Sequence, residues 1–247
     1  KSNLTSPDTI FLHEALQKIK KNNINNVIIE ASSHGLNQHR IDHLNIKAGI
    51  FTNFSQDHLD YHKTMQSYLK AKMILFNNLL AKRKTIISDS SIKEFSNLKK
   101  ISKKRKLNLI DISALKNKLH NNGKINFLNE FQLKNLLMAI SAAKLCNLSE
   151  KKIFNILDKL KDVNGRLEHV RTFPNNVRVF VDFAHTPDAL SKTISALKLR
   201  FGNNITLVFG CGGNRDFKKR PLKAKIADKN CKKIYITDDN PRNERPE

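Results

Sequence analysis

Long apolar runs, paired cysteines and a Walker A motif are all missing from this sequence. No apolar stretch approaches the roughly 20 residues needed to cross a bilayer, and the first residues contain no apolar core of a signal peptide. Cys146, Cys211 and Cys231 lie far apart without a CxxC pair, which argues against a disulfide framework and a zinc site. We therefore expect a cytosolic protein without a membrane partner.

Acidic residues are also scarce: 22 Asp and Glu stand against 45 Lys and Arg, which gives a formal net charge of +23. Clustered basic residues would indicate nucleic-acid binding, because they neutralise phosphates. Here the lysines are spread along the chain among Asn and Ile, as in residues 18–29, "KIKKNNINNVII". We expect no nucleic-acid partner, and a basic nucleic-acid-binding α/β protein is the non-enzyme alternative.

Strand and helix patterns alternate in the first two thirds of the chain. Short β-branched runs predict strands at residues 26–30, 46–52 and 84–88. Helical periodicity predicts helices at residues 63–80, 90–100, 129–147 and 149–160, the last capped by Ser149. Residues 106–128 are less regular and are expected to hold short strands or hairpins. This alternation is typical of an α/β sheet.

Asn164 and Gly165 interrupt the pattern, and we predict a domain boundary there, which divides the chain into residues 1–163 and 164–247. Further strands are expected at residues 177–185, 204–210 and 232–237. A helix should begin after the first of them, with Thr186 as N-cap and Pro187 in its first turn, and another should follow the glycine loop. This is a second α/β unit, whose strands we expect to be parallel.

Polar residues follow several of these strands. Glu30, Asp182, the loop 210–216 and residues 238–242 all stand at predicted carboxyl ends, where open α/β sheets bind ligands. A lone acid at such a place is as often structural as functional. Four such places together indicate a binding site.

Lys72 occupies a position of a helix that periodicity would give to an apolar residue. Met65, Tyr68, Leu69 and Phe76 form an apolar stripe, and Lys72 fills its missing i+7 position. The lysine either extends its ammonium to the rim or lies near a cation or phosphate.

The residues around the second predicted strand are rich in histidine. His58 and His62 are four residues apart, but no HExxH acid accompanies them, which disfavours zinc. A carboxylate such as Glu30 with one histidine and waters would suit magnesium or manganese.

Seven motifs in order resemble the Mur ligases over nearly the whole chain. They are "EASSHGLNQHR", "FTNFSQDHLDYH", "YLKAK", "NGRLE", "VDFAHTPDAL", "FGCGGNRDFKKRP" and "TDDNPR". The resemblance is strongest to the branch that adds the third residue of the peptidoglycan stem peptide. It implies a partial P-loop-type central ATPase domain followed by a partial Rossmann-like α/β ligase domain. We expect a fragment without the UDP domain, the P-loop and the C-terminal end, inactive by itself.

The resemblance implies ATP-dependent amide formation through an acyl phosphate, with Mg²⁺ as cofactor. Its implied magnesium ligands, also the catalytic residues, are Glu30, His58 and Lys72, the last as a carbamate. Its implied ATP contacts are Asn135, Arg166 and Asp182. Its implied contacts to UDP-N-acetylmuramoyl-L-alanyl-D-glutamate are Thr5, Ser6, Ser32, Gln38 and Arg40. Its implied contacts to the incoming amino acid are Arg215, Asp239, Asn240, Pro241 and Arg242.

The sequence departs from the family pattern at two places. Leu4 stands where Asn or Tyr is usual, and "NEFQLKN" lacks the usual glycine and first asparagine while keeping Asn135. The "DNPR" motif with Arg242 resembles the version that accepts meso-diaminopimelate, since a guanidinium can bind the second carboxylate of that amino acid. A lysine-adding enzyme and a folylpolyglutamate synthase-like ligase are the enzyme alternatives. We expect a monomer.

Overall fold

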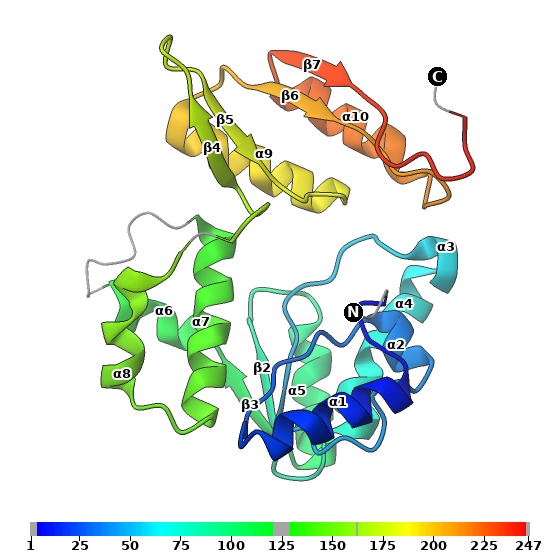
Figure 1. Ribbon diagram of the computed structural model, residues 1–247, viewed down its shortest axis with the longest axis vertical. Helices are drawn as coiled ribbons and strands as arrows, with labels where there is room; N and C mark the ends of the chain where they lie inside the picture. The colour runs from blue at the N-terminus through cyan, green and yellow to red at the C-terminus, as the bar shows by residue number, and fades with distance from the viewer. Residues whose placement is uncertain (1–3, 121–128, 162, 246–247) are drawn as a thin grey trace. The chain divides into compact units, whose positions relative to one another are not determined.

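The computed structural model describes residues 4–120, 129–161 and 163–245 of the chain. It forms two compact units, coloured along the chain in Figure 1. The first unit comprises Lys1–Phe54 and Thr64–Asp158, and the second comprises Ser55–Lys63 and Lys159–Glu247. Residues 55–63 therefore pack with the second unit, although they lie between two segments of the first. The domain boundary predicted between residues 163 and 164 stays a prediction.

The first unit is built on a parallel sheet. Its strands β1(Ala48–Ile50), β2(Thr85–Ser88) and β3(Asn108–Asp111) lie in the order β1-β2-β3. All four residues of the central β2 are buried. The α/β prediction is confirmed here, and so are the strands predicted within residues 46–52 and 84–88.

Helices cover both faces of this sheet. The first unit contains α1(Thr9–Lys21), α2(Ser33–Asn37), α4(Met65–Ile74), the π-helix η1(Leu75–Leu79), α5(Phe95–Arg105), α6(Ser113–His120), α7(Glu130–Leu145) and α8(Glu150–Asn155). The 3-10 helix η2(Leu157–Lys159) includes the last residues of this unit and the first residue of the next segment. Side chains alternate across a strand, so neighbours on β2 face opposite sides. Ile86 packs in a core cluster with α5 and η1, and Ile87 packs in a second cluster with α7 and α8.

Most of the predicted helices are confirmed. The helix predicted at residues 63–80 is α4 continued by η1, and α7 begins with a capping box between Asn129 and Gln132. Ser149 caps α8 through its hydroxyl, as predicted. The helix predicted at residues 90–100 begins later, at Phe95, because Asp89 accepts hydrogen bonds from Ser91 in a preceding turn. In the less regular stretch, β3 and α6 form, and residues 121–128 lie outside the described residues.

The strand predicted at residues 26–30 is wrong. These residues form no regular element, and Ile28 has 89% of its surface exposed. A strand is stabilised only by backbone hydrogen bonds to a neighbour. Among the described residues, β1 pairs with β2 alone, so the β-branched residues of this stretch have no strand to pair with.

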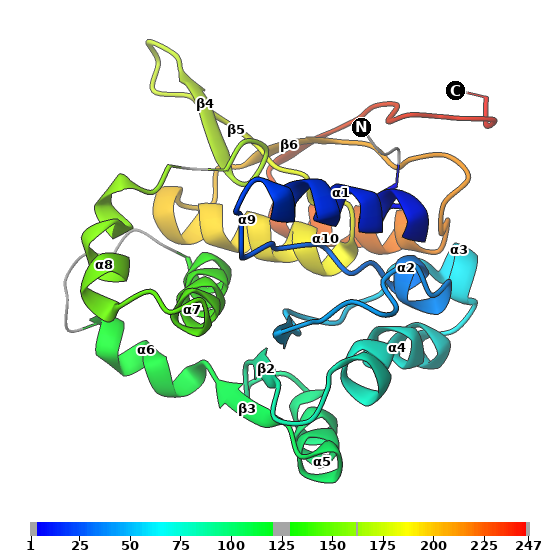
Figure 2. The ribbon, with the colours of Figure 1, turned by 60° about the horizontal axis from the view of Figure 1, so that its bottom comes forward.

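The second unit contains four strands and three helices among the described residues. They are β4(Glu168–Thr172), β5(Arg178–Val181), β6(Thr206–Phe209), β7(Lys233–Ile236), α3(Leu59–His62), α9(Pro187–Phe201) and α10(Lys219–Asn230). β6 and β7 pair in parallel, and α9 and α10 lie side by side in Figures 1 and 2. Thr186 caps α9, with Pro187 in its first turn, as predicted.

The expectation that the strands of this unit are all parallel is wrong for β4 and β5. These two strands pair in the antiparallel sense. The connection between them is short, and strands joined by a short hairpin can only run in opposite directions.

Among the described residues, no helix is long and apolar enough to span a bilayer.

Candidate functional site

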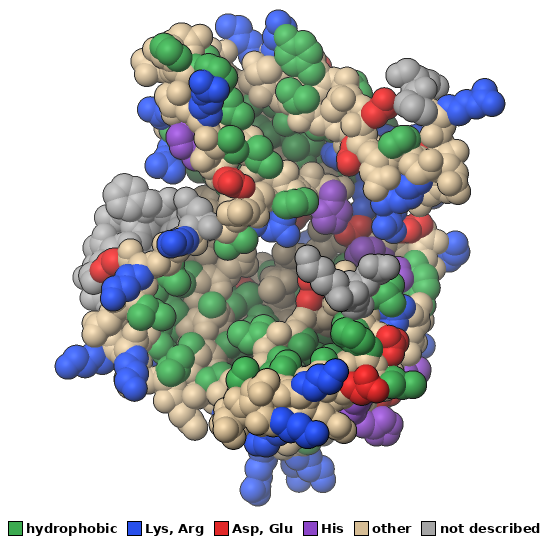
Figure 3. Space-filling view, in the orientation of Figure 1, with side chains coloured by type: hydrophobic (Ala, Val, Ile, Leu, Met, Phe, Trp, Pro, Cys, Tyr) green, Lys and Arg blue, Asp and Glu red, His purple; other side chains and the backbone are tan. Residues whose placement is uncertain are grey.

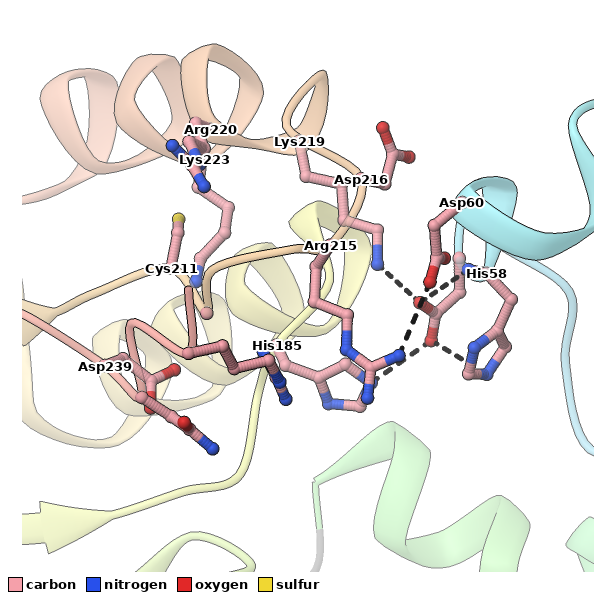
Figure 4. A pocket seen from close by; sticks show the side chains of 14 residues that line it. His58, Asp60, His185, Cys211, Arg215, Asp216, Lys219, Arg220, Lys223 and Asp239 are labelled. Carbon is pink, nitrogen blue, oxygen red and sulfur yellow. Dashed lines mark hydrogen bonds and ion pairs between the residues drawn. The ribbon is translucent and has the colours of Figure 1, made fainter. Parts of the chain in front are cut away.

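The second unit contains a polar cavity of about 270 Å³ (Figure 4). Five of the residues predicted to bind ligands line it: His58, Arg215, Asp239, Asn240 and Arg242. Cys211, Gly212 and Asp216 also line it and belong to the loop 210–216, which was expected at a binding edge. Sequence reasoning did not assign the other lining residues, which are Asp57, Asp60, His185, Lys219, Arg220 and Lys223. Cationic and anionic side chains are mixed, which suits a small ligand that carries both charges.

Two loops at the carboxyl ends of β6 and β7 form one wall of this cavity. Because the strands are parallel, both loops emerge at the same edge of the sheet. The amide of Gly213 donates a hydrogen bond to the carbonyl of Asn240 over 3.1 Å. A Cβ added to Gly213 would lie 1.9 Å from the carbonyl oxygen of Pro241, so only glycine allows the loops to approach this closely.

Arg242 braces the same wall. Its Nη1 donates to the carbonyl of Gly213 over 2.5 Å, and its own backbone is in the left-handed region at φ +52°. A guanidinium has five N–H donors, so this bond leaves others for a ligand.

Glu244 accepts hydrogen bonds from the amide of Asn214 over 2.7 Å and from Arg220 over 2.6 Å. The hydrogen bond from Arg220 lowers the pKa of Glu244.

Two lysines of α10 are buried at the cavity. Lys219 is 8% exposed and Lys223 is 4% exposed. The Nζ of Lys223 donates to the carbonyl of Gly210 over 2.7 Å and lies 5.1 Å from the centre of the Phe209 ring. Sequence reasoning missed both lysines, because no local pattern separates them from the exposed lysines of the same helix.

Asp57 lies at the centre of a charged network. Its carboxylate accepts hydrogen bonds from Lys219, from Nε2 of His185 at 3.1 Å and from the amide of His58 at 2.8 Å. Burial alone would raise the pKa of Asp57, but the hydrogen bonds from His185 and Lys219 and the nearby His58 charge outweigh it and lower the pKa far below its usual value.

The surroundings of His185 favour its cationic form. Its second ring nitrogen, Nδ1, lies 3.0 Å from the carbonyl oxygen of Phe183, so both ring nitrogens face acceptors. Only the doubly protonated imidazolium donates from both nitrogens. The hydrogen bond to Asp57 raises the pKa of His185 accordingly.

Asp182, a predicted ATP contact, holds the "NGRLE" loop. Its carboxylate accepts hydrogen bonds from the amide of Leu167 at 2.7 Å, the amide of Ala184 at 2.9 Å and the hydroxyl of Thr193 at 3.1 Å. Leu167 is in the left-handed region at φ +51°, a conformation that is costly for leucine and is fixed by this bond. The neighbouring Arg166, another predicted ATP contact, is exposed.

In the first unit, predicted contacts to the muramoyl dipeptide gather around Ser6, which is 1% exposed. Its hydroxyl donates to the carbonyl of Glu30 and accepts from the amide of Ser32, both at 2.9 Å. Arg40 donates to the carbonyl of Ser6 over 2.9 Å and also to the side chain of Gln38. The Ser6 hydroxyl therefore supports the loop, while Thr5, which is exposed, and Arg40, which is half-buried, are accessible.

Lys72 lies on α4 in a half-buried position between two aromatic rings. Its Nζ is 5.5 Å from the centre of the Phe51 ring and 5.6 Å from that of Tyr68. The ammonium thus lies beside two core aromatic rings, and the role of Lys72 as a metal ligand stays a prediction. Asn135 is exposed on α7, and the side chain of Glu30 is exposed.

The predicted magnesium ligands are divided between the two units. Glu30 and Lys72 belong to the first and His58 to the second, so this ligand set stays a prediction. Within residues 4–120, 129–161 and 163–245, no group of three or more His, Cys, Asp or Glu side chains lies close enough together to hold a metal ion.

Comparisons with known proteins agree over nearly the whole chain. Residues 1–143 match the Mur ligase middle domain, and residues 165–247 match the Mur ligase glutamate ligase domain. A UDP-N-acetylmuramoyl-L-alanyl-D-glutamate–2,6-diaminopimelate ligase of Rickettsia bellii is 39% identical over 98% of this chain and 55% of its own length. The ligase of the same name from Wigglesworthia glossinidia brevipalpis is 38% identical over 99% of this chain and 54% of its own length.

Solved structures give the same result. The structure of a UDP-N-acetylmuramoyl-L-alanyl-D-glutamate–2,6-diaminopimelate ligase matches 96% of this chain and 53% of its own, with 27% identity and a TM-score of 0.62. A folylpolyglutamate synthase in complex with AMPPCP and folate shares the fold, with 14% identity over 92% of this chain and 65% of its own and a TM-score of 0.60. The chain spans about half the length of the curated relatives it matches. With both of its domains matched and more than a third of its residues identical to such relatives, the chain belongs to the Mur ligase family.

Proposed function

We propose that this chain supplies the central and C-terminal parts of an ATP-dependent ligase that joins meso-diaminopimelate to UDP-N-acetylmuramoyl-L-alanyl-D-glutamate. The observation that carries this proposal is the cavity of the second unit, in which Arg215 and Arg242 accompany Asp239. The names of the relatives support it. The proposal includes a cytoplasmic location, a monomeric state and a role in peptidoglycan synthesis.

In the proposed reaction the D-glutamyl carboxylate attacks the γ-phosphate of ATP, and ADP leaves. The amine of diaminopimelate then attacks the carbonyl carbon of the acyl phosphate, loses a proton and expels inorganic phosphate. The cavity residues bind and orient the amino acid so that its amine reaches this carbonyl. A free carboxylate of diaminopimelate forms charge-assisted hydrogen bonds with Arg242, whose remaining N–H donors can make a two-pronged contact.

Glu30, His58 and Lys72 are the residues proposed to hold Mg²⁺. A carboxylate, an imidazole and carbamate oxygens are donors that suit this cation, which neutralises the charge of the phosphates when bound. The carbamate forms when the neutral Lys72 amine adds carbon dioxide and releases a proton. The position of Lys72 on the core side of α4, half-buried beside Phe51 and Tyr68, supports this role.

The remaining proposed contacts follow the family motifs. Asn135, Arg166 and Asp182 contact ATP in this proposal. Thr5, Ser6, Ser32, Gln38 and Arg40 form the region for the muramoyl dipeptide, with the Ser6 hydroxyl acting through its hydrogen bonds to Ser32 and Glu30.

The experiment that tests the proposal measures phosphate release by the full-length encoded protein with ATP, the UDP-muramoyl dipeptide and either meso-diaminopimelate or L-lysine. We expect meso-diaminopimelate to be the better substrate, because lysine leaves the Arg242 donors unpaired. Arg242→Ala should lower kcat/KM for meso-diaminopimelate on the order of 10²-fold, the effect of losing charge-assisted hydrogen bonds.

Arg242→Lys is the matched control. It keeps a positive charge and a donor for the Gly213 carbonyl but cannot form a forked contact. We expect it to preserve the fold of the loop and still lose most of the preference for meso-diaminopimelate. Preference of the unmutated protein for L-lysine would identify it as the lysine-adding alternative, and turnover with a folate substrate would identify the folylpolyglutamate synthase-like one.

A further inference from the structure

Residues 55–63, here called the His58 segment, are held on the second unit by side chains from three different elements. Gln56 donates to Asp216 of the glycine loop over 2.9 Å. Arg215 of the same loop lies 3.4 Å from the carboxylate of Asp60. His185, which precedes α9, and Lys219, which opens α10, both contact Asp57.

Among the ion pairs in this set of contacts, the pair between Asp57 and Lys219 is the most buried. The side chains of the two residues are 15% and 11% exposed, whereas those of Arg215 and Asp60 are 54% and 28% exposed. Charges in low-dielectric surroundings attract more strongly, and removing one partner leaves the other buried and unpaired. This pair therefore contributes most to fixing the His58 segment.

The backbone of His58 depends directly on Asp57. His58 lies in the left-handed region at φ +54°, which few residues other than glycine adopt. Its amide donates to Oδ1 of Asp57 over 2.8 Å, and its ring Nε2 lies 3.5 Å from Oδ2. Asp57 thus holds His58 through both backbone and side chain, while Lys219 holds Asp57.

We propose that Asp57 and Lys219 form a positioning pair that fixes His58 against the amino-acid cavity. This inference rests on the proposed function of that cavity. Neither residue needs to touch a substrate: Lys219 orients Asp57, and Asp57 orients His58, which lines the cavity together with Arg215 and Asp216. His58, the proposed magnesium ligand, is thereby held next to the loop 210–216, which is proposed to bind the incoming amino acid.

The first test needs no substrate. Hydrogen–deuterium exchange of the full-length protein should become faster in residues 55–63 when Lys219→Met removes the pair, and Lys219→Arg should restore the slow exchange. Lys225→Met is the matched control, because Lys225 is exposed on the same helix α10 and does not line the cavity. Asp57→Asn, which preserves the size of the side chain, provides a second variant if Lys219→Met does not fold.

The second test is kinetic. A displaced His58 should reduce kcat on the order of 10²-fold while leaving KM for ATP nearly unchanged, since misplacement of a reacting group affects the chemical step. Lys219→Arg should recover most of kcat. Unchanged exchange in residues 55–63 in both Lys219→Met and Asp57→Asn would overturn the pairing. Hydrogen exchange is measured without substrate, so it tests the pairing of Asp57 with Lys219 independently of the proposed function. A failure to ligate diaminopimelate would disprove the proposed function and would not change the exchange result.

Discussion

Replacement of Lys134 by methionine should destabilise the first unit far more than the same change at a neighbouring lysine. Lys134, on α7, lies 2.9 Å from the carboxylate of Asp89, which follows β2 directly and has a side chain only 4% exposed. Lys134 also contacts Ser91 at 2.9 Å and Glu130 at 3.1 Å. The pair joins the helix to the end of the central strand.

The magnitude follows from what remains after the change. Asp89 would keep two hydrogen bonds from Ser91, at 2.9 and 2.8 Å, but would lose the ammonium of Lys134. Loss of a hydrogen bond to a charged group costs about 1.5–3 kcal/mol, and breaking a fully buried pair about 3–5 kcal/mol. Since Lys134 is itself 32% exposed, we expect a loss of about 2–3 kcal/mol.

The effect should depend on pH in a defined direction. Burial would raise the pKa of Asp89, but hydrogen bonds from Lys134 and Ser91 outweigh it and lower the pKa. A carboxylate with a lowered folded-state pKa contributes stability above its unfolded pKa of about 3.9 and loses it as the pH falls through the folded value. The difference in the free energy of unfolding between the unmutated chain and Lys134→Met should therefore be largest near neutral pH and shrink below about pH 4.

Urea unfolding of the 247-residue chain at pH 7 and pH 3, with hydrogen exchange at the α7 amides to follow the first unit, measures both effects. Lys144→Met is the matched control: Lys144 lies on the same helix, but its partner Glu150 is 58% exposed, so its loss should cost less than about 1 kcal/mol. Equal losses for the two variants, or a Lys134→Met loss that persists undiminished at pH 3, would refute the reasoning.

Three further changes test other parts of the chain. Gly213→Ala should destabilise the second unit by about 3 kcal/mol or more in thermal unfolding, since its Cβ would collide with the backbone. Gly202→Ala, at φ +81° but with open space around the new Cβ, should cost only about 1 kcal/mol in the same assay. Asp182→Asn should lower the melting temperature of the second unit and speed exchange at the Leu167 amide, which loses its charged acceptor; unchanged exchange there would contradict this role. Lys72→Ala should abolish turnover of the full-length protein, with partial recovery on addition of short carboxylic acids, and normal turnover would exclude the carbamate.

Periodicity predicted much of the fold because it reports which side chains are buried. Ile86 and Ile87 are completely buried on opposite faces of β2, and the run around them was recognisable as a strand. The π-helix η1 was not predicted, since one wider turn hardly changes the apolar pattern that ends at Phe76. The run at residues 26–30 has strand composition without a strand, because composition does not report whether a partner is present.

The candidate site was only partly predictable for a related reason. Motifs pointed to Arg215 and Arg242, whereas Lys219 and Lys223 were overlooked. In a chain with 45 basic residues, a lysine on a basic helix is predicted to be solvent-exposed. Burial of these two side chains follows from tertiary contacts to Asp57 and to the Gly210 carbonyl, which no local pattern encodes.

The close approach of Gly213 to Pro241 has a consequence for protein engineering. The glycine loop and the loop after β7 share a backbone hydrogen bond and leave no room for a side chain between them, and Glu244 ties the second loop to Asn214 and Arg220. If only one of the two loops were replaced by the loop of a relative, its backbone would fit that relative's second loop and not the one present here. Only a graft that carries residues 210–220 together with 238–244 preserves the fit, so these two stretches form a single module for redesign.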